Sequence, residues 1–281
     1  MSTLPTIEEL LSSSAREICE FYAKTFRMSG PRAICSRYSY PGAKHTPQLL
    51  VQMLSGHSYN ISQLVIAIYM EFRRLFRIKD LCPKDLSFLG VNHDNPEAIS
   101  GDSATGVDGI TKELKESVEA GAILRLYGNL ACRDFMIAEF KRYEARDEYP
   151  TQIVKMTDSI ELILFSQLCV RNGVGMIKQT SDGFVLITDE KDRLVDPRTH
   201  AEISDYFKEN GLVLLEDTLF KDNSGNLPIS RIMYDHSLSR LENQFGERAP
   251  ELIEIFKLIS KEAATFPFEN FNFKNMPAMF L

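Results

Sequence analysis

The side chains best able to perform chemistry in this chain are its cysteines and histidines, five of each. A reactive thiolate needs a neighbouring histidine or a helix N-terminus. Cys35 lies in a segment that reads as an exposed loop, whereas Cys19, Cys132 and Cys169 stand beside apolar residues. A thiol hydrolase built on Cys35 would take its base from one of the histidines: His45, His57, His93, His200 and His236. No spacing selects a pair, so we assign no catalytic residue.

A metal site is not predicted either. The chain contains no CxxC pair and no two histidines at metal-ligand spacing, so we expect no metal and no cofactor. Asp94 and Asp102 share a polar segment and could ligate a divalent cation. That segment lacks the every-second-residue carboxylates of a calcium loop. A solvated linker explains the two aspartates better.

The charge of the chain is unevenly distributed. Residues 1–90 carry 11 Lys and Arg against 7 Asp and Glu, whereas the remaining residues carry 21 against 32. Arginine binds phosphate with two parallel hydrogen bonds, and tyrosines such as Tyr38 and Tyr40 could stack on unpaired bases. We therefore predict that a groove in the basic part contacts nucleic-acid backbone through six side chains: Arg32, Arg37, Lys44, Arg73, Arg74 and Arg77. Pairing of these side chains with the acidic part of the same chain is the alternative.

The pattern of apolar residues predicts a mainly α protein. Thr6 and Glu9 form a capping box at the start of a helix that ends near Gly30. Apolar residues at helical spacing predict a helix over 61–79, whose arginines lie opposite the apolar side. Further helices are expected over 109–120, 123–146, 160–171, 229–244 and 250–264, with Asp158 and Glu161 capping the third of them.

Residues 174–196 change from helical periodicity to alternation, which predicts a small antiparallel β-meander. The order of helix, turn, helix and hairpin resembles a winged helix. The preceding apolar helix has almost no side chain that could read bases, so such a module would contact protein. We predict a two-lobed protein: a basic helical lobe (1–90), a linker (91–108), an acidic helical body with the meander (109–265), and an arm (266–281).

The last 16 residues form the predicted arm, since prolines interrupt any helix there. Exposed phenylalanines would promote aggregation, so the arm must dock into a groove of the same molecule or of a neighbour. In the second case the arm mediates self-association through five residues: Phe266, Phe268, Phe271, Phe273 and Phe280.

These observations support three classes of function. The first is a non-enzymatic protein for macromolecular binding or assembly, with nucleic acid and a second copy of the chain as partners. The second is a protein–protein adaptor or regulator, and the third is the thiol enzyme. Residues 1–20 contain four glutamates and no apolar run, so we expect no signal peptide. Apolar runs are too short to span a bilayer, which predicts a cytoplasmic protein without membrane contact.

Overall fold

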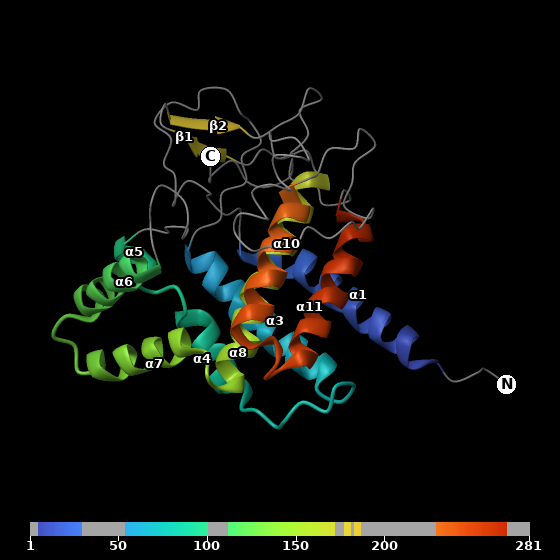
Figure 1. The fold of residues 1–281 in the computed structure, drawn as a ribbon, viewed down its shortest axis with the longest axis horizontal. Coiled ribbons are helices and arrows are strands. Elements are labelled where there is room, and N and C mark those ends of the chain that lie inside the picture. The colour runs from blue at the N-terminus through green and yellow to red at the C-terminus, as the bar shows by residue number, and fades with distance from the viewer. Residues whose placement is uncertain are drawn as a thin grey trace.

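The computed structural model describes residues 5–29, 54–100, 112–171, 177–180, 183–186 and 229–268, which are mainly helical (Figure 1). The amino-terminal half contains α1 (Ile7–Ser29), α3 (Leu54–Phe72), α4 (Pro83–Asn92), α5 (Glu97–Ser100), α6 (Lys112–Tyr127) and α7 (Arg133–Ala145). The remainder contains α8 (Tyr149–Arg171), the strands β1 (Ile177–Thr180) and β2 (Gly183–Leu186), α10 (Ile229–Leu241), a π-helical turn (Glu242–Gly246) and α11 (Pro250–Thr265).

Local sequence signals account for several of these helices. The capping box at α1 is confirmed: the backbone N–H of Thr6 donates to Glu9 Oε2 at 2.7 Å, and the N–H of Glu9 donates to Thr6 Oγ1 at 3.2 Å. Proline stands in the first turn of α4, α8 and α11, where its missing N–H breaks no helical hydrogen bond. The apolar side of α3 is also confirmed, since Ile61, Leu64, Val65, Ile68 and Phe72 are buried.

Helix α8 lies at the centre of the molecule. It contacts α3, α4, α7, α10 and α11, while α1 packs against both α3 and α11. Residues on every side of α8 are buried, from Ile153 through Ile163 to Phe165. An apolar helix with neighbours on all sides is a core helix. The polar side chains of α8 are therefore held in fixed positions by the packing around them.

The predicted fold class is wrong, although its helical character is confirmed. The predicted basic lobe and acidic body share one apolar core, which runs from Ala15 on α1 to Phe268. Opposite net charge did not separate them, because burial of apolar helix faces decides which helices pack together. Of the predicted meander, the described residues contain the two-stranded hairpin β1–β2, with Thr180 paired to Gly183, and no winged helix.

Several predicted helix boundaries also need correction. Helix α3 ends at Phe72, so Arg73, Arg74 and Arg77 follow the helix instead of lying on one of its faces. Arg77 has a positive φ of 53°, which is incompatible with a continuous helix. Helix α8 begins at Tyr149, so Asp158 lies in its interior and is not a cap.

The segment predicted as a linker is ordered where the structure describes it. Residues 91–92 end α4, Asp94–Asn95 form a turn, and α5 follows. Its polar side chains are used internally: Asn95 Nδ2 donates to Asn92 Oδ1 at 2.6 Å and to Tyr127 Oη at 2.7 Å. The polar composition of this segment predicted a solvated linker. In the structure, the hydrogen bonds of its asparagine side chains hold a tight turn instead.

Helices α3 and α4 approach each other closely at Gly90. A Cβ at this position would lie 3.0 Å from Ser62 Cα, so a larger residue would require the two helix backbones to move apart by a few tenths of an ångström. On the other side of α4, Arg142 of α7 binds both carboxylate oxygens of Asp85 at 3.0 Å. The contact at Gly90 fixes the carboxyl end of α4 against α3, and the contact at Asp85 fixes its first turn against α7.

The first two phenylalanines of the predicted arm belong to the core of the same molecule. Phe266 and Phe268 are buried and their ring centroids are 4.7 Å apart. Their rings thus dock into a groove of the same molecule in this structure, and self-association through the five phenylalanines stays a prediction. The other three predicted positions, Phe271, Phe273 and Phe280, lie outside the described residues. Within the described parts of the chain, no helix combines the length and apolar character needed to cross a membrane.

Candidate metal centre

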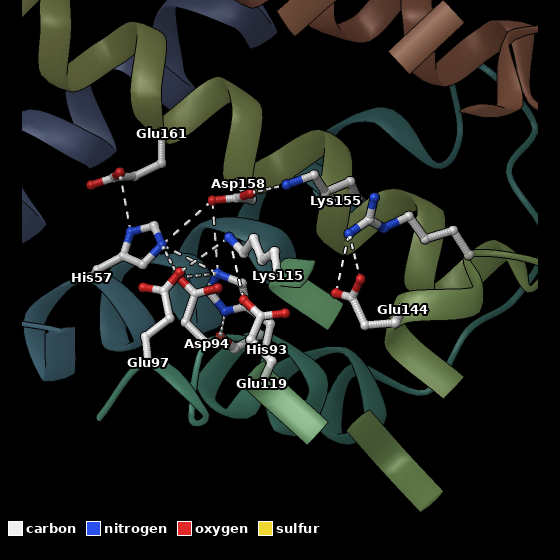
Figure 2. A network of polar contacts seen from close by, with 12 residues as sticks. His57, His93, Asp94, Glu97, Lys115, Glu119, Glu144, Lys155, Asp158 and Glu161 are labelled. Atoms are coloured by element: carbon white, nitrogen blue, oxygen red, sulfur yellow. Dashed lines mark hydrogen bonds and ion pairs between the residues drawn. The ribbon is translucent and has the colours of Figure 1, made fainter. Parts of the chain in front are cut away.

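Four side chains from three helical segments meet beside the central helix (Figure 2). His57 lies in the first turns of α3, on the side of the helix that carries Ile61 one turn later. His93 and Asp94 follow the end of α4, and Asp158 projects from α8. The two histidines are almost fully buried, with exposed fractions of 4% and 3%.

The nitrogen and oxygen atoms of these side chains converge on one point. His57 Nε2 lies 3.2 Å from His93 Nε2 and 3.0 Å from Asp94 Oδ2. Asp158 Oδ1 lies 3.4 Å from His57 Nε2 and 3.7 Å from His93 Nε2. Asp94 Oδ2 is 3.1 Å from His93 Nε2. Each side chain thus directs one donor atom suitable for a metal into a common space.

Groups behind the histidines select which ring nitrogen faces this space. His93 Nδ1 lies 2.8 Å from the carbonyl oxygen of Gly90, which can only accept, so Nδ1 carries the proton. His57 Nδ1 faces Glu161 Oε2 at 3.3 Å, and Glu161 Oε1 accepts a hydrogen bond from Tyr22 at 3.1 Å. A carboxylate or carbonyl behind a histidine is the usual outer support of a metal ligand.

The four groups fit a divalent transition metal. Two Nε2 lone pairs and two carboxylate oxygens that point at one another are repulsive unless a proton or a cation lies among them. Imidazole and carboxylate together suit Mn²⁺, Fe²⁺ or Zn²⁺ better than Ca²⁺, which prefers oxygen ligands alone. His57, His93 and Asp94 offer ligand atoms within 4.8 Å of one another, and Asp158 completes the set.

A second group of charged side chains lies next to this cluster (Figure 2). Glu97 of α5 is nine-tenths buried and lies 3.7 Å from Lys115 Nζ, which also pairs with Glu119 at 3.3 Å. Lys155 Nζ donates to Asp158 Oδ2 at 2.5 Å. Asp158 therefore turns one oxygen to the histidines and the other to a lysine.

Comparison with known proteins connects this geometry to a family. Residues 51–190 match the family model of the HD domain. The match begins before α3 and includes His57, the adjacent His93-Asp94 pair and Asp158. No curated protein and no solved structure matches the chain. HD domains are all-helical and typically are metal-dependent phosphohydrolases, so the match does not support a non-enzymatic binding protein.

The cluster of His57, His93, Asp94 and Asp158 has a defined electrostatic state without a metal. Burial by itself would lower the pKa of His93, but Asp94 and Asp158 raise it to about 9. The pKa values of both carboxyls lie well below their usual range: despite burial, nearby His93 lowers that of Asp94, and Lys155 and the histidines lower that of Asp158. The metal-free protein therefore holds a charged His93 between two carboxylates.

This state predicts how the stability of the metal-free protein depends on pH. Because folding raises the pKa of His93 from about 6.5 to about 9, its contribution is complete below pH 6.5 and disappears as pH rises through 9. We expect the free energy of unfolding to fall over this range by up to roughly 3 kcal/mol. Urea denaturation in the presence of a chelator measures it. A His93→Gln variant should lose most of the decrease, and equal pH dependence in both proteins would contradict the assignment.

Among the sequence-predicted nucleic-acid residues, those that the structure describes are not brought to this site. Arg32, Arg37, Lys44 and Cys35 lie outside the described residues. Arg74 and Arg77 are exposed beyond the end of α3, and Arg73 lies over the ring of Tyr69 at 5.7 Å. Nucleic-acid contact by these six side chains stays a prediction.

Two of the histidines proposed as bases, His57 and His93, lie at the candidate metal centre. Their partners there are aspartates and not a cysteine. Sequence reasoning singled out Asp94 as a possible cation ligand and then favoured a linker. Asp158 was missed because its position before an apolar run resembled a helix cap. Two signals were available: the adjacent His93-Asp94 pair followed by Glu97, and the place of His57 one turn before the apolar side of α3.

Proposed function

We propose that this chain is a metal-dependent phosphohydrolase. The observation that carries the proposal is the convergence of His57, His93, Asp94 and Asp158 on one buried point, within a region similar to the HD domain. A bound divalent cation would supply positive charge that polarises a phosphoryl oxygen and makes a water molecule a better nucleophile. The remaining chemistry depends on side chains of the chain itself.

The two histidines and two aspartates hold the cation in a fixed position. Glu161 and the carbonyl of Gly90 keep the Nε2 atoms directed inward, which removes the need to reorganise the rings on binding. Lys155 holds the second oxygen of Asp158, so this carboxylate offers a single oxygen to the cation. Close packing at Gly90 keeps α3 and α4 at the spacing that this geometry requires.

Glu97 is the side chain best suited to accept a proton from the attacking water. It lies on the helical turn that follows Asp94, where the Glu97 N–H donates to the Asp94 carbonyl at 2.9 Å. Its carboxylate is buried and held by Lys115, itself paired with Glu119. A general base must be ionised and fixed in place, and a lysine at this distance favours the ionised form.

The proposal is tested by metal removal. Chelator-treated protein should hydrolyse neither p-nitrophenyl phosphate nor bis(p-nitrophenyl) phosphate, and addition of Mn²⁺ should restore hydrolysis of at least one. We expect calorimetry to show Mn²⁺ binding at one main site, stronger at pH 8 than at pH 6 because protons compete for the histidines. Absence of Mn²⁺ binding, or equal hydrolysis with and without chelator, would overturn the proposal.

A further inference from the structure

A cavity of about 160 Å³ opens next to the candidate metal centre, and its wall contains both cationic and acidic side chains. His93 and Asp94 line it on one side. Four cationic side chains line it from separate elements: Lys115 of α6, Arg146 after α7, Lys155 of α8 and Arg240 of α10. Helix α10 lies beyond residues 51–190, so Arg240 comes from outside the HD-domain match.

The cations next to α8 outnumber the carboxylates that neutralise them. Arg146 Nη2 pairs with Glu144 at 3.2 Å, and Lys155 shares Asp158 with the two histidines. Arg240 makes no ion pair with any residue that the structure describes. Of the other carboxylates in the cavity wall, Glu144 pairs with Arg146, and Glu119 pairs with Lys115 of the same helix, on which Glu116 also lies. When Asp158 faces a metal cation, Lys155 and Arg240 therefore have no carboxylate partner among the described ion pairs.

A neighbouring histidine responds to this local positive charge. Desolvation lowers the pKa of His236, and the charges of Arg240 and Lys155 lower it further. Like charges that crowd together in this way favour the arrival of an anion.

Two unusual backbone conformations place side chains in the cavity wall. Arg146 adopts a left-handed conformation with φ of 53°, although it is not a glycine. Its carbonyl oxygen accepts hydrogen bonds from Gln152 Nε2 at 3.0 Å and from Arg248 Nη2 at 3.4 Å, which hold the conformation. Gln244 stands in the π-helical turn that continues α10. Such turns occur frequently at functional sites.

Both side chains also have an unsatisfied polar atom. Arg146 is nine-tenths buried, and its Nε atom has no hydrogen-bond partner among the described residues. The buried Oε1 atom of Gln244 likewise has none within the described part of the chain. A buried polar atom without a partner is destabilising; the Arg146 Nε–H is a donor available to an anion, whereas Gln244 Oε1 is an acceptor.

We propose that Arg146, Lys155 and Arg240 form an anion subsite that holds the phosphate group of the substrate against the metal centre. The inference rests on the proposed function and names its substrate class. A phosphomonoester carries two negative charges near neutral pH and exposes three terminal oxygens, whereas a diester carries one charge and exposes two. Three cations on one side of the phosphoryl group therefore select monoesters.

Binding of inorganic phosphate to the Mn²⁺-loaded protein tests the subsite without turnover. Arg240→Gln should raise the phosphate Kd about tenfold, as for loss of one charge-assisted hydrogen bond, and leave the Mn²⁺ Kd unchanged. Arg125→Gln, which alters an exposed arginine of α6 outside the cavity wall, should change neither. If Arg240→Gln leaves the phosphate Kd unchanged, the anion subsite is wrong. The proposed function still stands in that case, provided that the protein binds Mn²⁺. If the unaltered protein does not bind Mn²⁺, both the anion subsite and the proposed function are overturned.

Substrate preference gives a second measurement. We expect Arg240→Gln to lower kcat/KM at least tenfold for p-nitrophenyl phosphate and less than threefold for bis(p-nitrophenyl) phosphate. An equal decrease for the two substrates would show that Arg240 supports the fold or the metal centre and does not distinguish the ester. Unchanged thermal unfolding of the metal-free variant separates that outcome from a folding defect.

Discussion

Replacement of Asp158 by asparagine is expected to weaken Mn²⁺ binding at least about 100-fold and to lower phosphoester hydrolysis by roughly 1,000-fold. Asp158 is the one ligand that α8 contributes, and its Oδ1 faces both histidine Nε2 atoms. The amide has the same shape but no charge, so the cation loses a strong ligand while the helix packing is retained. Calorimetry of Mn²⁺ binding and hydrolysis of p-nitrophenyl phosphate measure the two losses.

Asp134→Asn provides the matched control. Asp134 is exposed in the first turn of α7 and pairs with its neighbour Arg133 at 2.9 Å, so its replacement should alter neither measurement. Asp94→Asn should reproduce the defects of Asp158→Asn through a different segment of the chain. If both ligand variants fold and bind Mn²⁺ normally, the metal centre is assigned to the wrong residues.

Replacement of Glu97 by glutamine is expected to separate metal binding from chemistry. Glu97 is outside the four-residue ligand set, so the Mn²⁺ Kd should change less than about threefold. Glutamine cannot accept a proton, and loss of a general base lowers kcat by roughly 100- to 10,000-fold. The KM for p-nitrophenyl phosphate should stay similar, since the phosphate-binding cations are unaltered.

A structural role for Glu97 would give a different result. Lys115 Nζ lies near both Glu97 and Glu119, so either carboxylate could hold the lysine in place. Glu119→Gln is therefore the matched control, and we expect it to retain kcat within about tenfold. Equal losses of kcat in the two variants would show that Glu97 acts by positioning Lys115 and not as a general base. Tighter Mn²⁺ binding at high pH should persist in both.

Much of the helical structure was predictable because its causes are local. The capping box of Thr6 and Glu9, the proline before α11 and the apolar spacing of α3 depend on residues within a few positions of one another. The predicted helix boundaries were wrong where local sequence signals competed. Asp158 and Glu161 resemble a cap ahead of an apolar run, but Pro150 in the first turn and burial along the whole segment start α8 at Tyr149.

The metal centre could not be derived in the same way. His57 and His93 are 36 residues apart in sequence, and their Nε2 atoms lie 3.2 Å apart in space. This proximity depends on the packing of α3 against α4 at Gly90 and on the position of α8 beneath both. Charge segregation along the chain pointed to two lobes, yet screened surface charges contribute little compared with a shared apolar core.

The sequence alone determined that this chain is helical, where several of its helices begin, and which side of α3 is buried, since these properties follow from hydrogen bonding and periodicity over short distances. Only the tertiary structure decided that two histidines and two aspartates share one point, and that Arg240, 82 residues after Asp158, borders the same cavity. Packing of distant helices sets these distances to within a few ångströms, and no spacing along the chain records them.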